Sequence, residues 1–227
     1  MKKILVTGAN KGIGLGIVTR LLRSCPDTFV YLGCRDAERG YSAIEPLAKE
    51  CPDWAERLCV LEIDVADQNS TELAASKIRE YHSADDSLLY AIVNNAGIAR
   101  SDAGVAPIIE VNTFGPKRVF EEFVNLIDPK NGRIVNVTSA SGPNYLSHCD
   151  EYVRKKLTSQ NISWDEIANF VESFLNEYEY ASADEKERLY SHVYGFSKAC
   201  TNALTIYLAN SHSNLIINSC TPGFIET

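Results

Sequence analysis

The stretch Thr7-Gly8-Ala9-Asn10-Lys11-Gly12-Ile13-Gly14 decides the fold, because it joins an apolar run to the start of a helix. The run at 4–7 is apolar and partly β-branched, which predicts a first strand. A glycine-rich turn between a strand and a helix brings free backbone N–H groups and the positive end of the helix dipole to one point. The turn therefore predicts a phosphate-binding site, and a tight turn that binds nothing is the plain alternative.

The same order of strand and helix continues along the chain. We expect strands at 4–7, 29–32, 60–64, 89–94, 133–139 and 215–220, and helices at 14–23, 37–49, 70–81, 116–126 and 197–210. Most of the strands are continuous apolar runs, which is typical of strands covered on both faces. The alternation predicts an α/β fold of three layers, a doubly wound parallel sheet of the Rossmann type with helices on both faces.

From Ala140 to Val193 no strand is predicted, so the alternation is interrupted. The residues 163–166 have the sequence of a capping box, and apolar residues follow at helical spacing. Ser182 and Glu185 predict the start of a further helix. We therefore expect an inserted helical segment at about 140–193, before the helix at 197–210. It would lie within a single domain that spans 1–227.

Composition narrows the classes of function. The chain has 227 residues, a formal net charge of −8 and 45% hydrophobic residues, as expected for a globular domain. An acidic balance without a clustered basic face argues against nucleic acid as a partner, and no apolar run is long enough to span a membrane. Seven scattered cysteines, without metal-ligand spacing, predict reduced thiols, no metal site and a cytoplasmic location. The four histidines show no partner pattern.

Three kinds of nucleotide site compete for the glycine turn. A P-loop requires Gly-Lys-Ser/Thr five residues after its first glycine, where this chain has Ile13-Gly14-Leu15. The run 12–16 has the G-x-G-x-G spacing of a methyltransferase, but that site wants an acid at the end of the second strand, which is absent here. The spacing T-G-x-x-x-G-x-G favours a dinucleotide site and leaves the methyltransferase as a distant alternative.

The end of the second strand indicates which dinucleotide would bind. An acid there would bind the 2′-hydroxyl of NAD, whereas a cation accommodates the 2′-phosphate of NADP. Cys34 stands in the place of the acid, Arg35 follows it, and Lys11 in the glycine turn adds a second positive charge. We therefore favour NADP over NAD, with Arg35 as an ordinary surface charge being the alternative. Asp36 is expected to point away from the site.

Tyr194 and Lys198 stand four residues apart, so a helix would place a phenol and an ammonium on one face. A free phenol titrates near ~10, and a nearby cation makes a phenol a stronger acid. Ser139 ends a predicted strand at the carboxyl edge of the sheet, where ligands of such folds bind. Each residue also has a plainer interpretation, since Tyr-x-x-x-Lys occurs by chance, Ser139 could close a turn and Asn112 could cap a helix.

Together the motifs resemble the short-chain dehydrogenases/reductases, and most of all the monomeric NADPH-dependent carbonyl reductases. The matching residues run in the family's order along nearly the whole chain: Thr7-Gly8-x-x-x-Gly12-x-Gly14, Asp64-Val65, Asn94-Asn95-Ala96-Gly97, Asn112, Ser139, Tyr194, Lys198 and Pro222-Gly223. Two features are similar to those of the carbonyl reductase subgroup: the residues Asn10, Lys11 and Arg35, and the long gap from Ser139 to Tyr194. The resemblance implies a monomer that acts on a small carbonyl compound, an aldehyde, ketone or quinone.

The resemblance also implies a role for each matching residue. Tyr194 would be the general acid in carbonyl reduction by NADPH, and Lys198 would acidify its phenol and bind the nicotinamide ribose. Ser139 would stabilise the substrate oxygen, and Asn112 would hold a water that relays protons to Lys198. Cofactor contacts are expected from Gly8, Asn10, Lys11, Gly12, Ile13, Gly14, Arg35, Asp64, Val65, Asn95, Ala96, Gly97, Tyr194, Lys198, Pro222 and Gly223.

The sequence departs from the family's pattern in two places. It ends soon after Pro222-Gly223, where family members continue into a substrate loop and a last strand, so we expect these parts to be missing. The segment from Gly97 to Asn112 is short for the subgroup. These departures leave an alternative hypothesis, an NADP-binding protein of the same fold with little or no catalysis.

Overall fold

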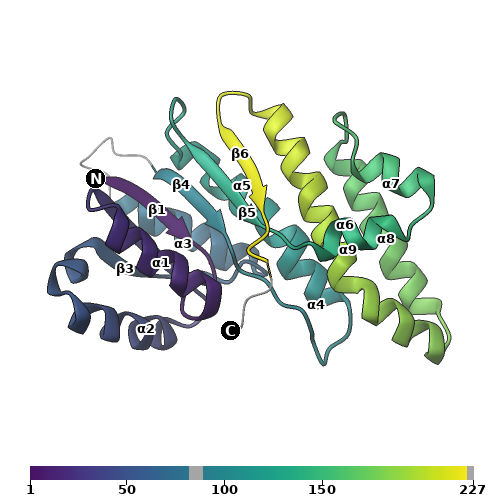
Figure 1. The fold of residues 1–227 in the computed structure, drawn as a ribbon, viewed down its shortest axis with the longest axis horizontal. Helices are drawn as coiled ribbons and strands as arrows, with labels where there is room; N and C mark the ends of the chain where they lie inside the picture. Colours follow the sequence, from purple (N-terminus) through teal and green to yellow (C-terminus); the bar gives the residue numbers. More distant parts are fainter. Residues whose placement is uncertain (82–88, 224–227) are drawn as a thin grey trace.

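The computed structural model describes residues 1–81 and 89–223 and contains a six-stranded sheet in which every pair of neighbours is parallel (Figure 1). The strands lie in the order β3-β2-β1-β4-β5-β6. The chain adds β2 and β3 on one side of β1 and then crosses over to add β4, β5 and β6 on the other side. Their bounds are β1 (Lys2–Val6), β2 (Thr28–Cys34), β3 (Leu58–Glu62), β4 (Leu89–Asn94), β5 (Arg133–Val137) and β6 (Ile216–Cys220). The predicted doubly wound parallel sheet is confirmed.

Helices cover both faces of the sheet. The first face carries α1 (Gly12–Ser24) and α2 (Ala37–Glu50), and the second carries α3 (Gln68–Tyr81), α5 (Gly115–Phe123) and α9 (Ala183–Ser211). Neighbouring residues of β1 point to opposite faces, so Ile4 and Val6 join the core under α1 and α2 while Leu5 joins the other core. This two-sided burial explains why the strands are continuous apolar runs. In the described ranges no helix is long and apolar enough to cross a membrane.

The remaining elements are shorter helices and turns. They are η1 (Pro52–Arg57), α4 (Ala106–Ile109), the π-helical turn η2 (Glu110–Phe114), η3 (Val124–Leu126), α6 (Ser141–Ser147), α7 (Glu151–Leu157) and α8 (Trp164–Tyr180). The expected inserted segment consists of α6, α7, α8 and the first part of α9. In Figure 1 these helices gather at one end of the molecule, beyond β6.

A capping box opens α8, as the sequence predicts. The Ser163 hydroxyl accepts from the Glu166 N–H at 3.2 Å, and the Glu166 carboxylate accepts from the Ser163 N–H at 3.0 Å. Directly after the cap, the Trp164 ring meets Phe114 edge to face at 5.6 Å, and the Lys117 ammonium lies 4.7 Å from its centroid. The start of α8 is therefore packed against η2 and α5.

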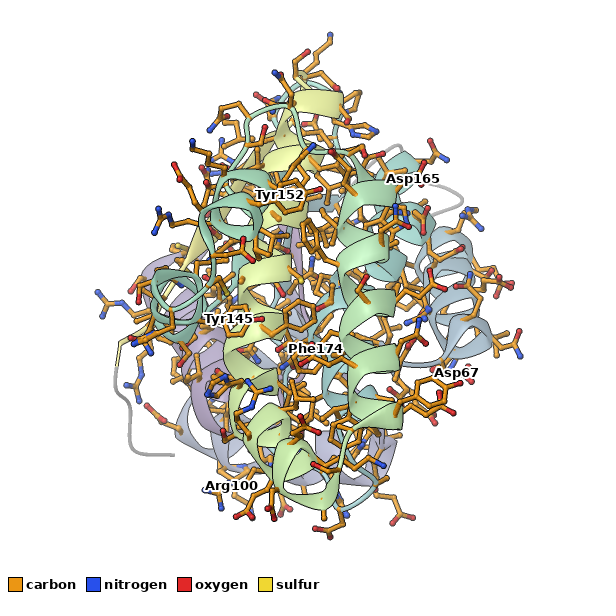
Figure 2. The ribbon with its side chains drawn as sticks, turned by 90° about the vertical axis from the view of Figure 1, so that its right-hand side faces the viewer. Asp67, Arg100, Tyr145, Tyr152, Asp165 and Phe174 are labelled. Atoms are coloured by element: carbon orange, nitrogen blue, oxygen red, sulfur yellow. The ribbon has the colours of Figure 1, made fainter. Side chains whose placement is uncertain are left out.

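Aromatic side chains join the insert to α9. Phe174 of α8 stacks on Phe196 at 4.3 Å between ring centroids, and Tyr145 of α6 meets the same ring at 5.6 Å. Figure 2 looks onto this layer, where α8 and α9 lie side by side with Tyr145 and Phe174 labelled. Because these rings belong to the core that also contains strand residues, the insert packs onto the α/β body.

Several predicted boundaries are wrong. The helix expected at 197–210 begins at Ala183, because the Ser182–Glu185 capping box starts it and nothing interrupts it before Ser211. The last part of the insert and the segment that carries Lys198 thus belong to one helix, α9. Gly195 lies inside this helix, and because a Cβ atom there would lie only 2.9 Å from the Ser141 carbonyl oxygen, the glycine lets α6 pack closely against α9. The first helix starts at Gly12 instead of Gly14, and β5 ends at Val137, before Ser139.

We predict that Phe174→Ala destabilises the whole described core, because the ring is 5% exposed and stacks on Phe196. The free energy of unfolding should fall by about 3 kcal/mol. Urea denaturation followed by circular dichroism and by tryptophan fluorescence measures it. Tyr180→Ala is the matched control, since Tyr180 is 83% exposed and its removal should change little. Two separate transitions in the wild type would contradict a single cooperative domain.

Candidate active site

The glycine turn is fixed to the end of β4. The Thr7 hydroxyl accepts from the N–H groups of Asn95 and Ala96, both at 3.1 Å, and the Asn95 side chain donates to the carbonyls of Thr7 and Gly8. Gly8 has φ +62°, and a Cβ atom at Gly14 would lie 2.5 Å from the Asn95 amide nitrogen. Glycines are therefore required here both for backbone conformation and for close approach.

The start of α1 exposes backbone donors. Lys11 is the N-cap residue in an extended conformation, and no side chain caps the helix. The first N–H groups of a helix have no partner within it, so those of Gly12, Ile13 and Gly14 are available to an anion. Together with the glycine turn they form a cradle of the kind that holds a phosphate.

Two cations flank this cradle. Lys11 and Arg35 are exposed, and neither forms an ion pair within residues 1–81 and 89–223. The Ala9 N–H donates to the Gly33 carbonyl at 2.9 Å, which holds the glycine turn beside the end of β2. Asp36 is occupied elsewhere, because its carboxylate caps α2 and pairs with Arg39 at 3.3 Å. The charge beside the cradle is therefore positive.

Lys198 is the buried charge of the site. Its side chain is 4% exposed, and its Nζ donates to the Val137 carbonyl at 2.9 Å and lies 5.8 Å from the centroid of the Tyr194 ring. Burial lowers the pKa of Lys198 to about 8, since removal from water disfavours the ammonium form. A Cβ atom at Gly97 would lie 3.4 Å from Nζ, so Gly97 leaves room for the ammonium.

Asn112 connects the loop after β4 to α9. Its Oδ1 accepts from the Ile98 N–H at 2.9 Å, and its Nδ2 donates to the Ile98 carbonyl and to the Ser197 hydroxyl. The Ser197 hydroxyl in turn donates to the Tyr194 carbonyl at 2.8 Å. Both Nδ2 hydrogens are thus used by the protein. No sequence motif points to Ser197, because its role depends on this tertiary contact.

Ser139 lies between β5 and α6. Its hydroxyl accepts from the Ser141 N–H at 3.1 Å and donates to the Ser141 hydroxyl at 3.2 Å, so it closes the turn that the plainer interpretation expects. The side chain is only partly buried. A carbonyl oxygen placed beside it could accept the hydrogen bond of the Ser139 hydroxyl in place of the Ser141 hydroxyl.

The other expected cofactor residues differ in their accessibility. Asp64 is half-buried and accepts from the Ala66 N–H at 3.0 Å, whereas the Val65 side chain is 5% exposed and packs in the core against Gly115. Pro222 and Gly223 are exposed just after β6. All of them follow the ends of parallel strands, so they share the carboxyl edge of the sheet with the glycine turn.

A half-open cavity of about 480 Å³ lies between α6 and α9, with Tyr194 in its wall. It is lined by Ser141, Asn144, Tyr145, His148, Cys149, Arg188, Ser191, His192, Tyr194 and Gly195. Two of the four histidines therefore belong to this cavity, which the sequence alone could not reveal; His82 lies outside the described residues. Within the described ranges no group of three or more His, Cys, Asp or Glu side chains could hold a metal ion.

A family model of the short chain dehydrogenases matches residues 2–161. Together with the parallel sheet and the glycine turn, this match shows that the chain belongs to the short-chain dehydrogenase family of oxidoreductases. Carbonyl reductase 1 (NADPH) of Bos taurus is 32% identical over 238 aligned positions, covering 98% of this chain and 81% of its own. The (+)-neomenthol dehydrogenase of Arabidopsis thaliana is 30% identical, with 98% and 82% covered.

Solved structures agree on the fold. Menthone neomenthol reductase from Mentha piperita superimposes with a TM-score of 0.81 at 24% identity, covering 97% of this chain and 89% of its own. The NADPH-bound carbonyl reductase from chicken fatty liver gives 0.65 at 24% identity, with 100% and 80% covered. The resemblance to the carbonyl reductases that the motifs indicate is therefore confirmed.

We predict that Lys198→Met stabilises the ligand-free protein. Below pH 8 Lys198 is charged in both states and its burial disfavours folding, whereas above its unfolded pKa both states are neutral and the penalty is gone. At pH 7 the free energy of unfolding of the variant should exceed that of the wild type by on the order of 3 kcal/mol. This difference should shrink as the pH rises from 8 to 10. Urea denaturation at each pH measures it. The exposed Lys155→Met is the control, and a pH-independent difference for Lys198→Met would refute this.

Proposed function

We propose that this protein reduces a carbonyl compound, an aldehyde, ketone or quinone, to an alcohol by hydride transfer from NADPH. The observation that carries the proposal is the buried ammonium of Lys198, held at the carboxyl edge of the sheet 5.8 Å from the Tyr194 ring. The carbonyl reductases to which the chain is similar support the reaction class and the cofactor. A buried cation beside a phenol is an arrangement suited to proton transfer.

The residues at the glycine turn fit a dinucleotide with a 2′-phosphate. The free N–H groups of Gly12, Ile13 and Gly14 would hold the pyrophosphate, and Lys11 and Arg35 would neutralise the 2′-phosphate. Further contacts would come from residues at the strand ends: Gly8, Asn10, Asp64, Val65, Asn95, Ala96, Gly97, Pro222 and Gly223. Val65 would contribute through its backbone, because its side chain is in the core.

NADPH supplies the hydride when it is bound, and the chain supplies the proton. As hydride adds to the carbonyl carbon, the Tyr194 hydroxyl gives its proton to the carbonyl oxygen, and the C=O double bond becomes a C–O single bond. The Ser139 hydroxyl stabilises the negative charge that develops on that oxygen. The Tyr194 phenolate regains a proton through Lys198 and a water near Asn112. The charge of Lys198 stabilises the phenolate in the meantime.

We also propose that the protein acts as a monomer in the cytoplasm on small molecules. Trp164 at the start of α8 packs on Phe114 and Lys117, so the insert occupies the surface beside α5 and α9. This is the surface that other members of the family are expected to use for dimerisation. All seven cysteines are free, as a reducing compartment would keep them.

Tyr194→Phe should abolish reduction while NADPH still binds. The substitution removes only the hydroxyl that donates the proton, so kcat should fall by about 100-fold or more. NADPH oxidation with a panel of aldehydes, ketones and quinones measures turnover, and fluorescence titration measures binding. If neither the wild type nor the variant turns over any member of the panel while both bind NADPH, the alternative of a non-catalytic NADP-binding protein is the correct one.

Arg35→Gln should reduce the preference for NADPH. Loss of the charge that faces the 2′-phosphate should weaken NADPH binding roughly tenfold and leave NADH binding nearly unchanged. Arg39→Gln is the matched control, because Arg39 is close in sequence but pairs with Asp36. If Arg35→Gln weakens the binding of NADPH and NADH equally, then Arg35 does not contact the 2′-phosphate.

A further inference from the structure

The cavity beside Tyr194 lies between one face of α6 and one face of α9. One side of its lining is Ser141, Asn144 and Tyr145 of α6 with His148, the residue that follows α6, and the other side includes Arg188, Ser191, His192 and Gly195 of α9. Both sets have the spacing i, i+3, i+4, i+7, which is one face of a helix. The two helices approach closely at Gly195, where a Cβ atom would lie 2.9 Å from the Ser141 carbonyl oxygen and 3.0 Å from Tyr145 Cβ. The cavity is thus built by a register between two helices.

Among its lining residues the cavity has one charged side chain, that of Arg188, beside hydroxyl, amide and imidazole groups that can donate or accept hydrogen bonds. Arg188, His148 and His192 line it, and no described lining residue is acidic, in a chain whose formal net charge is −8. The Arg188 guanidinium pairs with Glu177 of α8 at 3.4 Å, and its charge also acts on the carboxylate of Glu185, one turn earlier on α9. The side chains of Arg188 and Glu177 are both more than half exposed, and an exposed pair of this kind contributes little, so a better-placed carboxylate can replace Glu177.

We propose that this cavity selects carbonyl substrates that carry a carboxylate, with Arg188 as the anion-binding residue and His192 beside it. Arg188 precedes Tyr194 by six residues on α9, which separates them by roughly 9 Å along the helix axis. An acid whose carbonyl group lies at Tyr194 can therefore extend its other end to Arg188. This inference rests on the proposed carbonyl reduction and names its substrate class.

The test compares 4-carboxybenzaldehyde with 4-carbamoylbenzaldehyde, which has a similar shape and no charge. For the wild type with NADPH, kcat/KM should be higher for the acid. Arg188→Gln should lower kcat/KM for the acid about fivefold to tenfold, the size of one charge-assisted contact in a partly exposed site, and leave the amide within about twofold. The ratio of kcat/KM for acid and amide is compared between each variant and the wild type, so that the electronic difference between the substrates cancels.

Two further variants separate recognition from structure. Glu177→Gln removes the competitor of the substrate carboxylate and should raise the preference for the acid, whereas a role of the ion pair in holding α8 to α9 would lower both rates. Lys155→Gln on α7 changes the net charge equally at a residue outside the cavity lining and should change neither rate. If Arg188→Gln affects acid and amide equally, the inference is wrong. If neither aldehyde is reduced by the wild type, the proposed function itself fails.

Discussion

The burial of one ammonium group constrains most of the site. Lys198 is held by the Val137 carbonyl, and the charge can sit there only because the surrounding backbone supplies polar contacts and space. Gly97 leaves room next to Nζ, and Asn112 fixes the loop that contains Gly97. The end of β5, the loop after β4 and the middle of α9 must therefore all keep their positions for this residue to stay buried.

The same constraint accounts for the hydrogen bonds between α9 and η2. The Thr201 hydroxyl bonds to the carbonyl of Asn112, and the Thr113 hydroxyl to that of Ser197. These bonds lock the helix that carries Tyr194 to the loop under the cofactor cradle. On its other side α9 packs against α6 and α8 through Phe196. The glycine turn, Tyr194 and the cavity are consequently parts of one packed unit.

The sequence predicts the fold well because short local patterns of residues indicate which elements are buried. Continuous apolar strands report two-sided coverage, and the cap at Ser163 marks the start of α8 within one residue. It predicts less where a feature depends on two distant elements. The cavity needs the register of α6 against α9, so Arg188 and His192 carry no signal of their own. The hydrogen bond between Ser197 and Asn112 cannot be predicted from the sequence either, because the two residues are 85 positions apart.

The central claim is that Tyr194, Ser139 and Lys198 act on one reacting carbonyl above the cofactor. A crystal structure of the complex with NADPH and a slowly reacting ketone tests it most directly. The account predicts the ketone oxygen at hydrogen-bond distance, about 2.7 Å, from both the Tyr194 and Ser139 hydroxyls, and the Lys198 ammonium beside the nicotinamide ribose. A complex in which the Tyr194 hydroxyl points away from the bound nicotinamide would contradict it.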